Sequence, residues 1–506
     1  MRAFFLVFFA AALVSVGFAQ FRPVWTSNKH IKGDGPDRGD GIAVAPNGEV
    51  FVAGTCDPDG NPETFDADVL LVKYDREGEQ VFASQFSLTP ISDDQTTSIS
   101  LTPQGDIYVA GYTDDEYNHD SGEYNFLLLK FGQDGDLIWS RTYNGVGLAG
   151  NYAMSVLAQE DGGAVVTGYS PNWNGDTDAV TLRYSATGSL AWERRFAGSG
   201  SGNDFGWKIA RDGNGNLYIL GDAVNAGTGR DIVVIKYTSA GSLVYSTSYN
   251  GPDNGADHAG DFEVDLSGRV KATGSSFAGL AMQDIATLAL GQNGTIEWSR
   301  RWNGVTSNSD YGWSVVTDSA GNVYVAGTTT VNAFNLDGVL LKYSPSGTLL
   351  WNRQMGGSGV DGLIVALLGD LDTVFVVGYA SAVNGYLDFA IALYDSSGSI
   401  ISSQATDGGG NYDDAPLAAT IDLNNNVFAA GYTTHPVWGQ DMMTVRYQQK
   451  PFADLNEDYC VDDTDLSRVL TRFGATSNGP EDINRDGVVD DIDLAIVLTT
   501  FGMGCN

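Results

Sequence analysis

A short apolar stretch that ends in glycine recurs eight times along the chain. It reads FVAG, YVAG, VVTG, YILG, KATG, YVAG, FVVG and FAAG, and it ends at Gly54, Gly111, Gly168, Gly221, Gly274, Gly327, Gly378 and Gly431. Successive glycines are 57, 57, 53, 53, 53, 51 and 53 residues apart. A near-constant period of this length indicates one supersecondary unit repeated along the chain.

Each repeat contains four short apolar segments separated by turn residues. In the sixth copy they read WSVVTD, NVYVAGT, DGVLLKYS and TLLWNRQ. The second and third segments are almost continuously apolar, which is typical of strands buried on both faces of a sheet. The turn between the first and second segments contains only glycine, aspartate or asparagine at one position. These residues tolerate a positive φ, so we predict a left-handed residue in this turn. These turn residues are Gly48, Gly105, Gly162, Gly215, Gly268, Gly321, Asp372 and Asn425.

The last repeat is one segment short. It stops after its third segment at Tyr447, while an isolated segment, Pro23-Val24-Trp25-Thr26, stands near the N-terminus. That segment resembles the fourth segments of the other repeats, most of which carry an aromatic residue. If it completes the last sheet, the repeats close into a ring with no free edge. We therefore predict an all-β fold over residues 20–449, an eight-bladed, four-stranded β-propeller closed by an N-terminal strand. An open β-solenoid is the alternative.

The repeat resembles a known family. The repeat contains an acid, then an apolar run that ends in Lys-Tyr, a glycine turn and a Trp-containing segment. This order is similar to the SBBP-type β-propeller repeats of secreted bacterial proteins. The resemblance covers about 430 residues. It implies a propeller fold and export, and it implies no particular reaction.

The first 19 residues have the pattern of a secretory signal peptide. Arg2 precedes an apolar run, and the small-residue site Gly17-Phe18-Ala19 follows it. The run is short for a membrane anchor, which is the alternative. We expect cleavage after Ala19 and a secreted or cell-surface protein with no membrane span.

Composition narrows the range of partners. The chain has 27 Lys and Arg against 63 Asp and Glu, a formal net charge of −36. A nucleic-acid partner would require a basic surface, so this balance argues against one and favours metal cations. Neither an HExxH motif nor a GxSxG motif is present, and the four histidines are isolated in the sequence. A carboxylate pair of the kind that cleaves glycosidic bonds remains open among so many acids.

The loops between the second and third segments vary in length, so we predict that a ligand binds on their face of the propeller. Their aromatic residues could stack on sugar rings, bind peptides or simply pack over the blades. These residues are Tyr117, Tyr124, Trp173, Tyr386 and Trp438.

Two further features of the repeats predict structural roles. The third segments begin with Asp68, Asn125, Asp178, Asp231, Asp284, Asp337, Asp388 and Asp441. A repeated fold uses the same acid in each of its eight units, whereas catalysis does not require eight copies. We therefore expect these residues to accept hydrogen bonds from backbone N–H groups or to form a ring of charge on this face. The motifs Asp204-Phe205-Gly206-Trp207 and Asp310-Tyr311-Gly312-Trp313 are expected to fill space between blades.

The C-terminal residues 452–506 differ from the repeats and contain two similar acidic segments, 454–465 and 482–493. Oxygen-bearing side chains fall at positions 1, 3, 5, 9 and 12 of each, the alternation of a calcium-binding loop. The predicted side-chain ligands are Asp454, Asn456, Asp458, Asp462 and Asp465, then Asp482, Asn484, Asp486, Asp490 and Asp493. At position 7 the backbone carbonyls of Cys460 and Val488 would contribute. We predict two calcium ions, with folding coupled to their binding.

Each acidic loop is followed by an amphipathic helix pattern. Its apolar positions are Leu466, Val469, Leu470 and Phe473, then Leu494, Val497, Leu498 and Phe501, with Gly474 and Gly502 as the expected stops. Two loop–helix units without an entering helix resemble a type I dockerin.

That resemblance implies a cohesin-like protein partner. It also assigns partner contacts to Asp463, Thr464, Arg468, Asp491 and Ile492. The first loop departs from the pattern, because Tyr459 replaces the glycine expected at position 6 and predicts a weaker site. Cys460 and Cys505 bracket the module and could form a disulfide; Cys56 would then be unpaired and buried.

These observations favour an exported, non-catalytic propeller that binds or scaffolds a partner and is attached through a calcium-dependent dockerin. The alternative is a polysaccharide-degrading enzyme, a glycoside hydrolase or lyase, recruited by the same module. A quinoprotein dehydrogenase fits less well, because the chain has no vicinal cysteine pair. A ligand of the variable-loop face would be an extracellular polysaccharide or protein.

Overall fold

The computed structural model describes most of the chain. It covers residues 21–30, 36–57, 66–114, 124–146, 150–279, 282–304, 306, 308–332, 335–356, 359, 361–369, 372–382, 384–409, 412–436, 439–451, 453–456, 458–476, 479–483 and 487–502. The predicted signal peptide and several candidate site residues lie outside these ranges. The site residues are Tyr117, Trp438, Asn484, Asp486 and Cys505.

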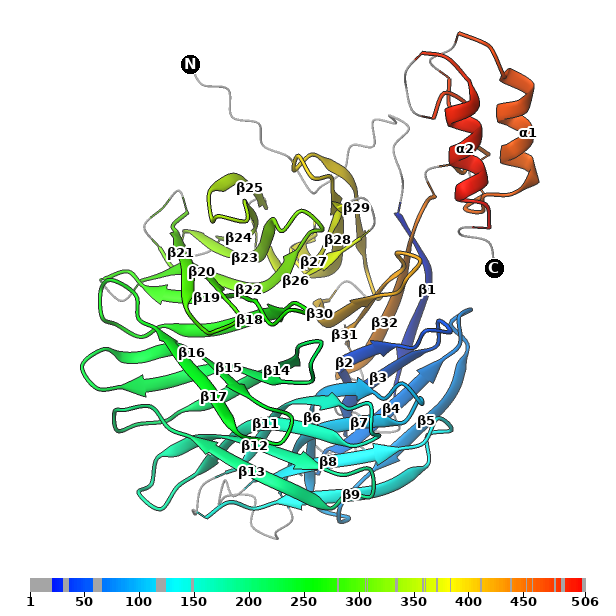
Figure 1. Ribbon diagram of the computed structural model, residues 1–506. Helices are drawn as coiled ribbons and strands as arrows, with labels where there is room; N and C mark the ends of the chain where they lie inside the picture. The colour runs from blue at the N-terminus through cyan, green and yellow to red at the C-terminus, as the bar shows by residue number, and fades with distance from the viewer. Residues whose placement is uncertain are drawn as a thin grey trace.

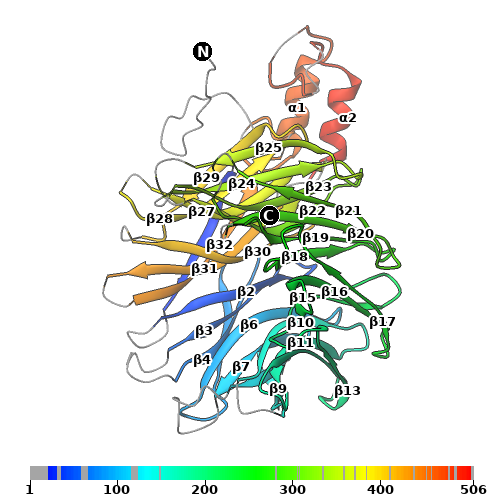
Figure 2. The same ribbon diagram turned by 90° about the vertical axis from the view of Figure 1, so that its left-hand side faces the viewer.

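Eight four-stranded antiparallel sheets form the blades of a β-propeller (Figures 1 and 2). Blades 1 to 4 contain β2 (Arg38–Val44), β3 (Val50–Cys56), β4 (Asp68–Tyr74), β5 (Gln80–Phe86); β6 (Asp93–Leu101), β7 (Ile107–Asp114), β8 (Asn125–Phe131), β9 (Leu137–Tyr143); β10 (Tyr152–Ala158), β11 (Ala164–Pro171), β12 (Thr177–Tyr184), β13 (Leu190–Phe196); and β14 (Phe205–Arg211), β15 (Leu217–Asn225), β16 (Gly229–Tyr237), β17 (Leu243–Tyr249).

Blades 5 to 8 follow the same order, and the last takes its fourth strand from the N-terminus. They contain β18 (His258–Val264), β19 (Val270–Phe277), β20 (Gln283–Leu290), β21 (Ile296–Trp302); β22 (Asp310–Thr317), β23 (Val323–Asn332), β24 (Asn335–Tyr343), β25 (Leu349–Met355); β26 (Gly362–Leu368), β27 (Val374–Ser381), β28 (Leu387–Tyr394), β29 (Ile400–Thr406); and β30 (Asp414–Ile421), β31 (Val427–His435), β32 (Gly439–Gln449), β1 (Phe21–Lys29).

The first strand of each blade lies at the centre of the ring. β2 contacts β6, and contacts of the same kind continue through β10, β14, β18, β22, β26 and β30 back to β2. The ring is therefore closed, which confirms the propeller over the solenoid. Figure 1 shows β1, in blue, beside β32, in orange. β1 pairs antiparallel with β32, with Trp25 opposite Arg446 and Pro23 opposite Tyr447, so the predicted closure by the N-terminal strand is confirmed.

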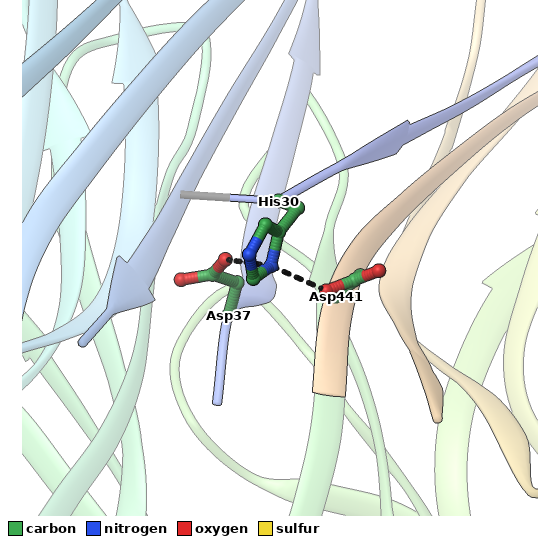
Figure 3. Close-up of side chains that lie close together, drawn as sticks. All are labelled: His30, Asp37 and Asp441. Atoms are coloured by element: carbon green, nitrogen blue, oxygen red, sulfur yellow. Dashed lines mark hydrogen bonds and ion pairs between the residues drawn. The ribbon is translucent and has the colours of Figure 1, made fainter. Parts of the chain in front are cut away.

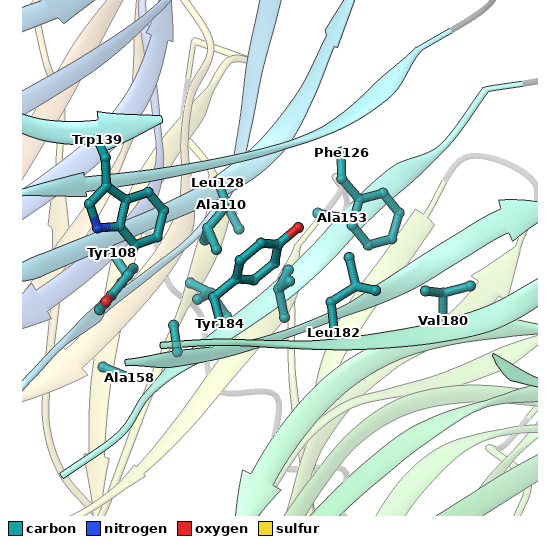
Figure 4. Packing of buried hydrophobic residues seen from close by; sticks show 13 residues of the cluster. Tyr108, Ala110, Phe126, Leu128, Trp139, Ala153, Ala158, Val180, Leu182 and Tyr184 are labelled. Atoms are coloured by element: carbon teal, nitrogen blue, oxygen red, sulfur yellow. The ribbon is translucent and has the colours of Figure 1, made fainter. Parts of the chain in front are cut away.

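The buried strands explain the apolar runs of the repeat. Every residue of β3 and β4 is buried, because each blade packs against a neighbour on both faces. Figure 4 shows one such contact, where Tyr108 and Trp139 of blade 2 pack against Leu182 and Tyr184 of blade 3. Burial of this kind, at about 25 cal/mol per Å² of apolar surface, is the main source of stability.

The repeated glycine that ends each apolar stretch is required by close backbone approach. At Gly221 an added Cβ would lie 1.9 Å from the carbonyl oxygen of Phe205 in the first strand. The equivalent distance lies between 1.8 and 2.2 Å in all eight blades. The predicted left-handed turns are also present, and Asp372 and Asn425 adopt φ values of 56° and 61° there.

Two short helices, α1 (Asp463–Arg472) and α2 (Asp491–Thr499), follow the propeller. A separate apolar core joins them; its buried residues are Ala453, Leu455, Val461, Val469, Ile483, Val489 and Val497. α2 ends earlier than expected, with Thr500 as its C-terminal cap. In the part of the chain that the structure describes, no helix has the length and apolar character needed to cross a membrane.

Candidate functional site

Each junction between neighbouring blades carries two acidic or amide side chains on the variable-loop face. One is the residue predicted to open the third strand. The other stands at or next to the first residue of the first strand of the next blade. The sequence analysis did not identify these residues as a set, although an acid or amide recurs at this position in every repeat. This second set comprises Asp37, Asp94, Asn151, Asp204, Asp257, Asp310, Asp361 and Asp414, and none is more than 5% exposed.

The second set holds the loops that enter each blade. Asp204 accepts hydrogen bonds from the backbone N–H of Gly198 at 3.0 Å and of Val224 at 2.6 Å. The N–H of Asp204 donates to the carbonyl of Thr177 in the preceding blade, at 2.8 Å. Asp257 makes the same set of contacts. These buried acids therefore connect adjacent blades, which explains their repetition.

The acids of the third strands are bonded differently from what we expected. In four of the eight blades their partners are side chains of the fourth strand and not backbone N–H groups. The Gln85 amide donates to Asp68 at 2.7 Å, the Gln354 amide to Asp337 at 2.7 Å, and Arg301 pairs with Asp284 at 2.6 Å. The interpretation as structural residues stands, because these pairs tie the third strand to the fourth.

Burial raises the pKa of several acids at the blade junctions. It raises the pKa of Asp94 to about 6, and the negative charge of the neighbouring Asp68 adds to the rise. The pKa values of Asp204 and Asp257 are also raised, mainly by burial. Carboxyl groups close together in a poorly solvated site resist ionisation, as they do here.

At the junction that closes the ring, a histidine lies between the two acids (Figure 3). The His30 Nδ1 is 3.0 Å from Asp441 Oδ1 and 3.8 Å from Asp37 Oδ2. Here the acids belong to blades 8 and 1, and the histidine follows the N-terminal strand. The isolated His30 of the sequence is thus brought together with two carboxylates by ring closure.

The two Gly-Trp motifs differ in how far they fill the space between blades: Phe205 and Trp207 pack against Tyr169 of blade 3, with ring centroids 4.8 and 5.7 Å away, whereas Trp313 does not stay buried. They lie on the innermost strands β14 and β22, and Trp313 is 45% exposed. Trp207 and Trp313 each occupy the bulge where the first strand loses register with the second. A bulge redirects the side chain of its extra residue, and this accounts for the exposure.

The two motifs form stacked aromatic pairs on alternate blades. The rings of Phe205 and Trp207 are 5.1 Å apart with an interplanar angle of 22°. The rings of Tyr311 and Trp313 are 5.7 Å apart with an angle of 19°. On blade 5, between them, the position equivalent to the tryptophans is Gly260. We call Phe205, Trp207, Tyr311 and Trp313 the axial aromatic surface.

Polar groups border the axial aromatic surface. The Arg230 guanidinium lies over the Phe205 ring, 4.7 Å from its centroid, and 3.7 Å from Asp222. The His258 Nδ1 is 3.5 Å from Asp222 Oδ2. Lys208 pairs with Asp261 at 2.7 Å. Aromatic faces beside a few placed polar groups are the usual composition of a small-molecule or sugar site.

The predicted loop aromatics that the structure describes do not form one site. Tyr124 packs against Tyr112 and Tyr152, with ring centroids 5.1 and 5.5 Å away, and its hydroxyl donates to Asp93 at 3.1 Å. Trp173 is 82% exposed at a turn. Tyr386 is 38% exposed and lies 5.5 Å from Tyr412, centroid to centroid.

The two acidic loops of the C-terminal module have matching hydrogen bonds. Asp465, at position 12 of the first loop, accepts the N–H of Leu455 at 2.6 Å, and Asp493 accepts that of Ile483 at the same distance. Both carboxylates are fully buried. Position 6 is left-handed in both loops, with φ of 69° at Tyr459 and 92° at Gly487.

The donor set of these loops suits calcium. It consists of carboxylate, amide and carbonyl oxygens, which calcium prefers. Asp454 and Asp482, at position 1, are 2% and 5% exposed. Charge buried without an external cation would be costly.

The predicted partner residues lie at the helix starts. Asp463, Thr464, Asp491 and Ile492 are exposed. Arg468 turns inward, donating to the Leu455 carbonyl at 2.6 Å and pairing with Glu481 at 3.2 Å.

The cysteines divide into two kinds. Cys460 is disulfide-bonded, and Cys56 is free and buried. Cys505, the partner expected from the sequence, lies outside the described residues.

Comparison with known proteins identifies the repeat and no activity. The SBBP family, described as a beta-propeller repeat, matches residues 297–335. No curated protein matches the chain.

Among solved structures, similarity is seen with a protein of unknown function from Dyadobacter fermentans, at 12% identity and a TM-score of 0.42 over 85% of this chain and 99% of that one. A puromycin hydrolase mutant gives 13% and 0.44 over 79% and 58%. A polysaccharide lyase, Uly1, gives 11% and 0.47 over 81% and 90%. Identity this low says nothing about shared activity.

Proposed function

We propose that this protein is an exported, non-catalytic binding protein whose propeller binds a polysaccharide chain at the axial aromatic surface. The observation that carries the proposal is the pair of aromatic stacks on β14 and β22, separated by Gly260 on β18. Gly260 is required there by close backbone approach, since an added Cβ would lie 2.1 Å from the carbonyl oxygen of Gly312 on β22.

The chemistry of the axial aromatic surface suits sugar rings. The apolar C–H face of a pyranose packs against an aromatic face, and its hydroxyl groups need hydrogen-bond partners. Arg230, His258 and Asp222 supply donors and acceptors beside the stacks. The net charge of −36 opposes anionic polymers, so a neutral polysaccharide is favoured.

Affinity measurements on the full chain with a panel of neutral polysaccharides test this function. We expect Trp313→Ala and Trp207→Ala each to weaken binding about tenfold or more, since stacked aromatic contacts contribute on the order of 1 kcal/mol or more each. Trp173→Ala is the matched control, because Trp173 is 82% exposed in a loop of blade 3, whereas the motifs lie on β14 and β22. Equal loss in all three variants, or none in any, would contradict the proposal. Release of reducing sugar by the wild type would favour the hydrolase or lyase instead.

We further propose that the C-terminal module is a calcium-binding dockerin that attaches the propeller to a cohesin-like domain. Its support is the matched buried carboxylates Asp465 and Asp493 and the apolar side chains left exposed on both helices and just after them. Leu470, Phe473, Ile492, Leu498 and Phe501 are each between 47% and 54% exposed. Apolar residues repeated on two helices offer a protein partner a buried interface centre.

Binding of the full chain to a type I cohesin domain, with calcium and with excess chelator, tests the attachment. We expect binding only with calcium, and a loss of affinity of about tenfold or more on Phe473→Ala. The control is Leu423→Ala, an exposed apolar residue of the propeller. Binding that survives chelation would contradict the calcium requirement.

A further inference from the structure

A continuous row of aromatic rings runs from blade 2 to the axial aromatic surface on blade 4. The Tyr112 ring centroid lies 4.9 Å from that of Tyr152, and the Tyr152 centroid lies 5.0 Å from that of Tyr169. Tyr169 in turn lies 4.8 Å from Phe205, which belongs to the axial aromatic surface. Tyr112, Tyr152 and Tyr169 are half-buried, so part of each side chain is accessible to solvent. We call these three residues the tyrosine row.

The hydroxyl groups of the tyrosine row have no hydrogen-bond partner within the described part of the chain, and none of the three is buried. Burial raises the pKa of Tyr169 to about 12, and the hydroxyls of Tyr152 and Tyr112 add to the rise, so the three groups lie near one another. A phenolic hydroxyl both donates and accepts hydrogen bonds. Three such groups gathered beside an aromatic surface suit a ligand that carries hydroxyl groups of its own.

An arginine is held in place beside the tyrosine row. The Arg38 Nε donates to Asp40 at 2.7 Å and its Nη2 donates to Gln95 at 2.9 Å, while the side chain remains 38% exposed. Burial raises the pKa of Tyr112, and the charge of the nearby Arg38 opposes the rise. The Arg38 Nη1 donates no hydrogen bond to any described residue, so it is available to a ligand. Because Asp40 offsets the charge of Arg38, a neutral ligand is favoured over an anion.

The residues at this level of the propeller do not repeat as structural residues do. The residue that follows each acid or amide of the second set is large on six consecutive blades and small on the last two. In blades 1 to 8 it is Arg38, Gln95, Tyr152, Phe205, His258, Tyr311, Gly362 and Ala415.

Blades 7 and 8 are the contrast. Tyr379 and Tyr432 stand opposite Gly362 and Ala415, at the positions equivalent to Tyr169, and neither packs against another aromatic ring among the described residues. The large aromatic and polar side chains therefore form an arc over blades 1 to 6. A structural role common to all blades would not produce this one-sided distribution.

We propose that the tyrosine row is a second subsite for the neutral polysaccharide, continuous with the axial aromatic surface, so that the propeller binds an internal stretch of the chain. The inference rests on the proposed function and extends it. The rings of the row pack against sugar faces, and its hydroxyls and Arg38 bond to sugar hydroxyls. Affinity then increases with chain length, because a short sugar covers only one of two linked subsites.

Titration calorimetry of the full chain with neutral sugars of two lengths tests the length dependence. The probes are cellohexaose, xylohexaose and mannohexaose, together with the disaccharide of whichever hexasaccharide binds. We expect the hexasaccharide to bind about tenfold or more tightly than its disaccharide. Equal affinities for the two lengths would overturn the second subsite.

The triple variant Tyr112→Phe, Tyr152→Phe and Tyr169→Phe isolates the hydroxyls. It keeps all three rings, and it should unfold at the wild-type temperature because the hydroxyls have no protein partner. Each lost hydrogen bond to the sugar should weaken hexasaccharide binding about fivefold, so we expect a combined loss of about tenfold or more. The matched control is Tyr379→Phe with Tyr432→Phe on blades 7 and 8, which should bind as the wild type does.

The outcomes separate the second subsite from the proposed function. If Trp313→Ala weakens hexasaccharide binding while the triple variant keeps the wild-type affinity, the second subsite is wrong and the axial aromatic surface stands. Equal losses in the triple variant and in the control pair would also overturn the second subsite. If the wild type binds none of the three hexasaccharides, the subsite and the proposed function are both overturned.

Discussion

The indole of Trp25 donates a hydrogen bond to the backbone carbonyl of Arg76, 3.3 Å away, and so joins the last blade to the first. The same bond connects other neighbouring blades: Trp139 donates to Ala186 and Trp298 to Pro345. In each case the ring also covers the left-handed glycine of the adjacent turn, which is Gly78 for Trp25. The N-terminal strand thus reproduces these tryptophan contacts of an ordinary fourth strand.

Trp25→Ala should weaken the closure of the ring. Trp25 packs against Tyr74 and Phe428, with centroids 5.4 and 6.3 Å away, so its loss leaves a cavity between blades 8 and 1. We expect a loss of about 2 kcal/mol in the free energy of unfolding, since Trp25 is only partly buried. Chemical denaturation followed by circular dichroism measures it, and Trp173→Ala should change stability by less than about 0.5 kcal/mol. Equal effects would mean that closure adds nothing.

Gly221→Ala should be far more damaging than Gly215→Ala. The first places a methyl group 1.9 Å from the Phe205 carbonyl, and strand separation must follow. The second has nothing within 4 Å and meets only the strain of φ +76°, about 1 kcal/mol. We expect Gly221→Ala to cost more than about 3 kcal/mol or to prevent folding. Comparable unfolding midpoints for the two variants would refute the close-approach explanation of the repeat.

Stability should depend on pH through Asp40 on β2. Burial raises the pKa of Asp40 to about 6, although Arg38, at 2.7 Å, acts in the opposite direction. The folded state therefore holds this proton more tightly than the unfolded state does. The favourable contribution is present below about pH 4 and is lost as the pH rises through about 6. Two pKa units correspond to about 3 kcal/mol at most.

Asp40→Asn should remove that dependence. Its stability relative to the wild type should increase between pH 4 and pH 7, as measured by denaturation at each pH. Glu77→Gln, at an exposed position, is the control and should leave the wild-type profile unchanged. A parallel profile for Asp40→Asn and the wild type would show that Asp40 is not the responsible group.

Calcium removal should unfold the C-terminal module while the blades stay folded. The four buried carboxylates of the two loops repel one another without a cation, at about 4 kcal/mol for a pair 4 Å apart at an effective dielectric of 20. Hydrogen exchange of α1 and α2 in the full chain, with calcium and with chelator, is the measurement. We expect protection of both helices to be lost in chelator, and Asp463→Asn, at an exposed position, to behave as the wild type. Helices that stay protected in chelator would refute calcium-coupled folding.

The repeat, the number of blades and the closure of the ring could all be predicted from the sequence. The glycine that ends each apolar stretch is required by local backbone geometry, and the apolar stretches are required by burial, so both recur with the period of the repeat. Trp25 identified the closing strand, because most repeats carry an aromatic residue at the same place in their fourth strand. The left-handed turns at Asp372 and Asn425 followed from the same logic.

What the sequence could not determine is which residues from different repeats meet. Asp388, Asp407 and Asp414 are ordinary acids among 63, and only the packing of blade 7 against blade 8 brings one carboxylate oxygen of each within 4.8 Å of the others. Likewise, both Gly-Trp motifs were expected between blades, and Trp207 does contact Tyr169 of blade 3, but the bulge at Trp313 leaves that side chain 45% exposed. Periodicity specifies each blade through short-range contacts, whereas the sites arise from contacts between blades, which only the tertiary structure decides.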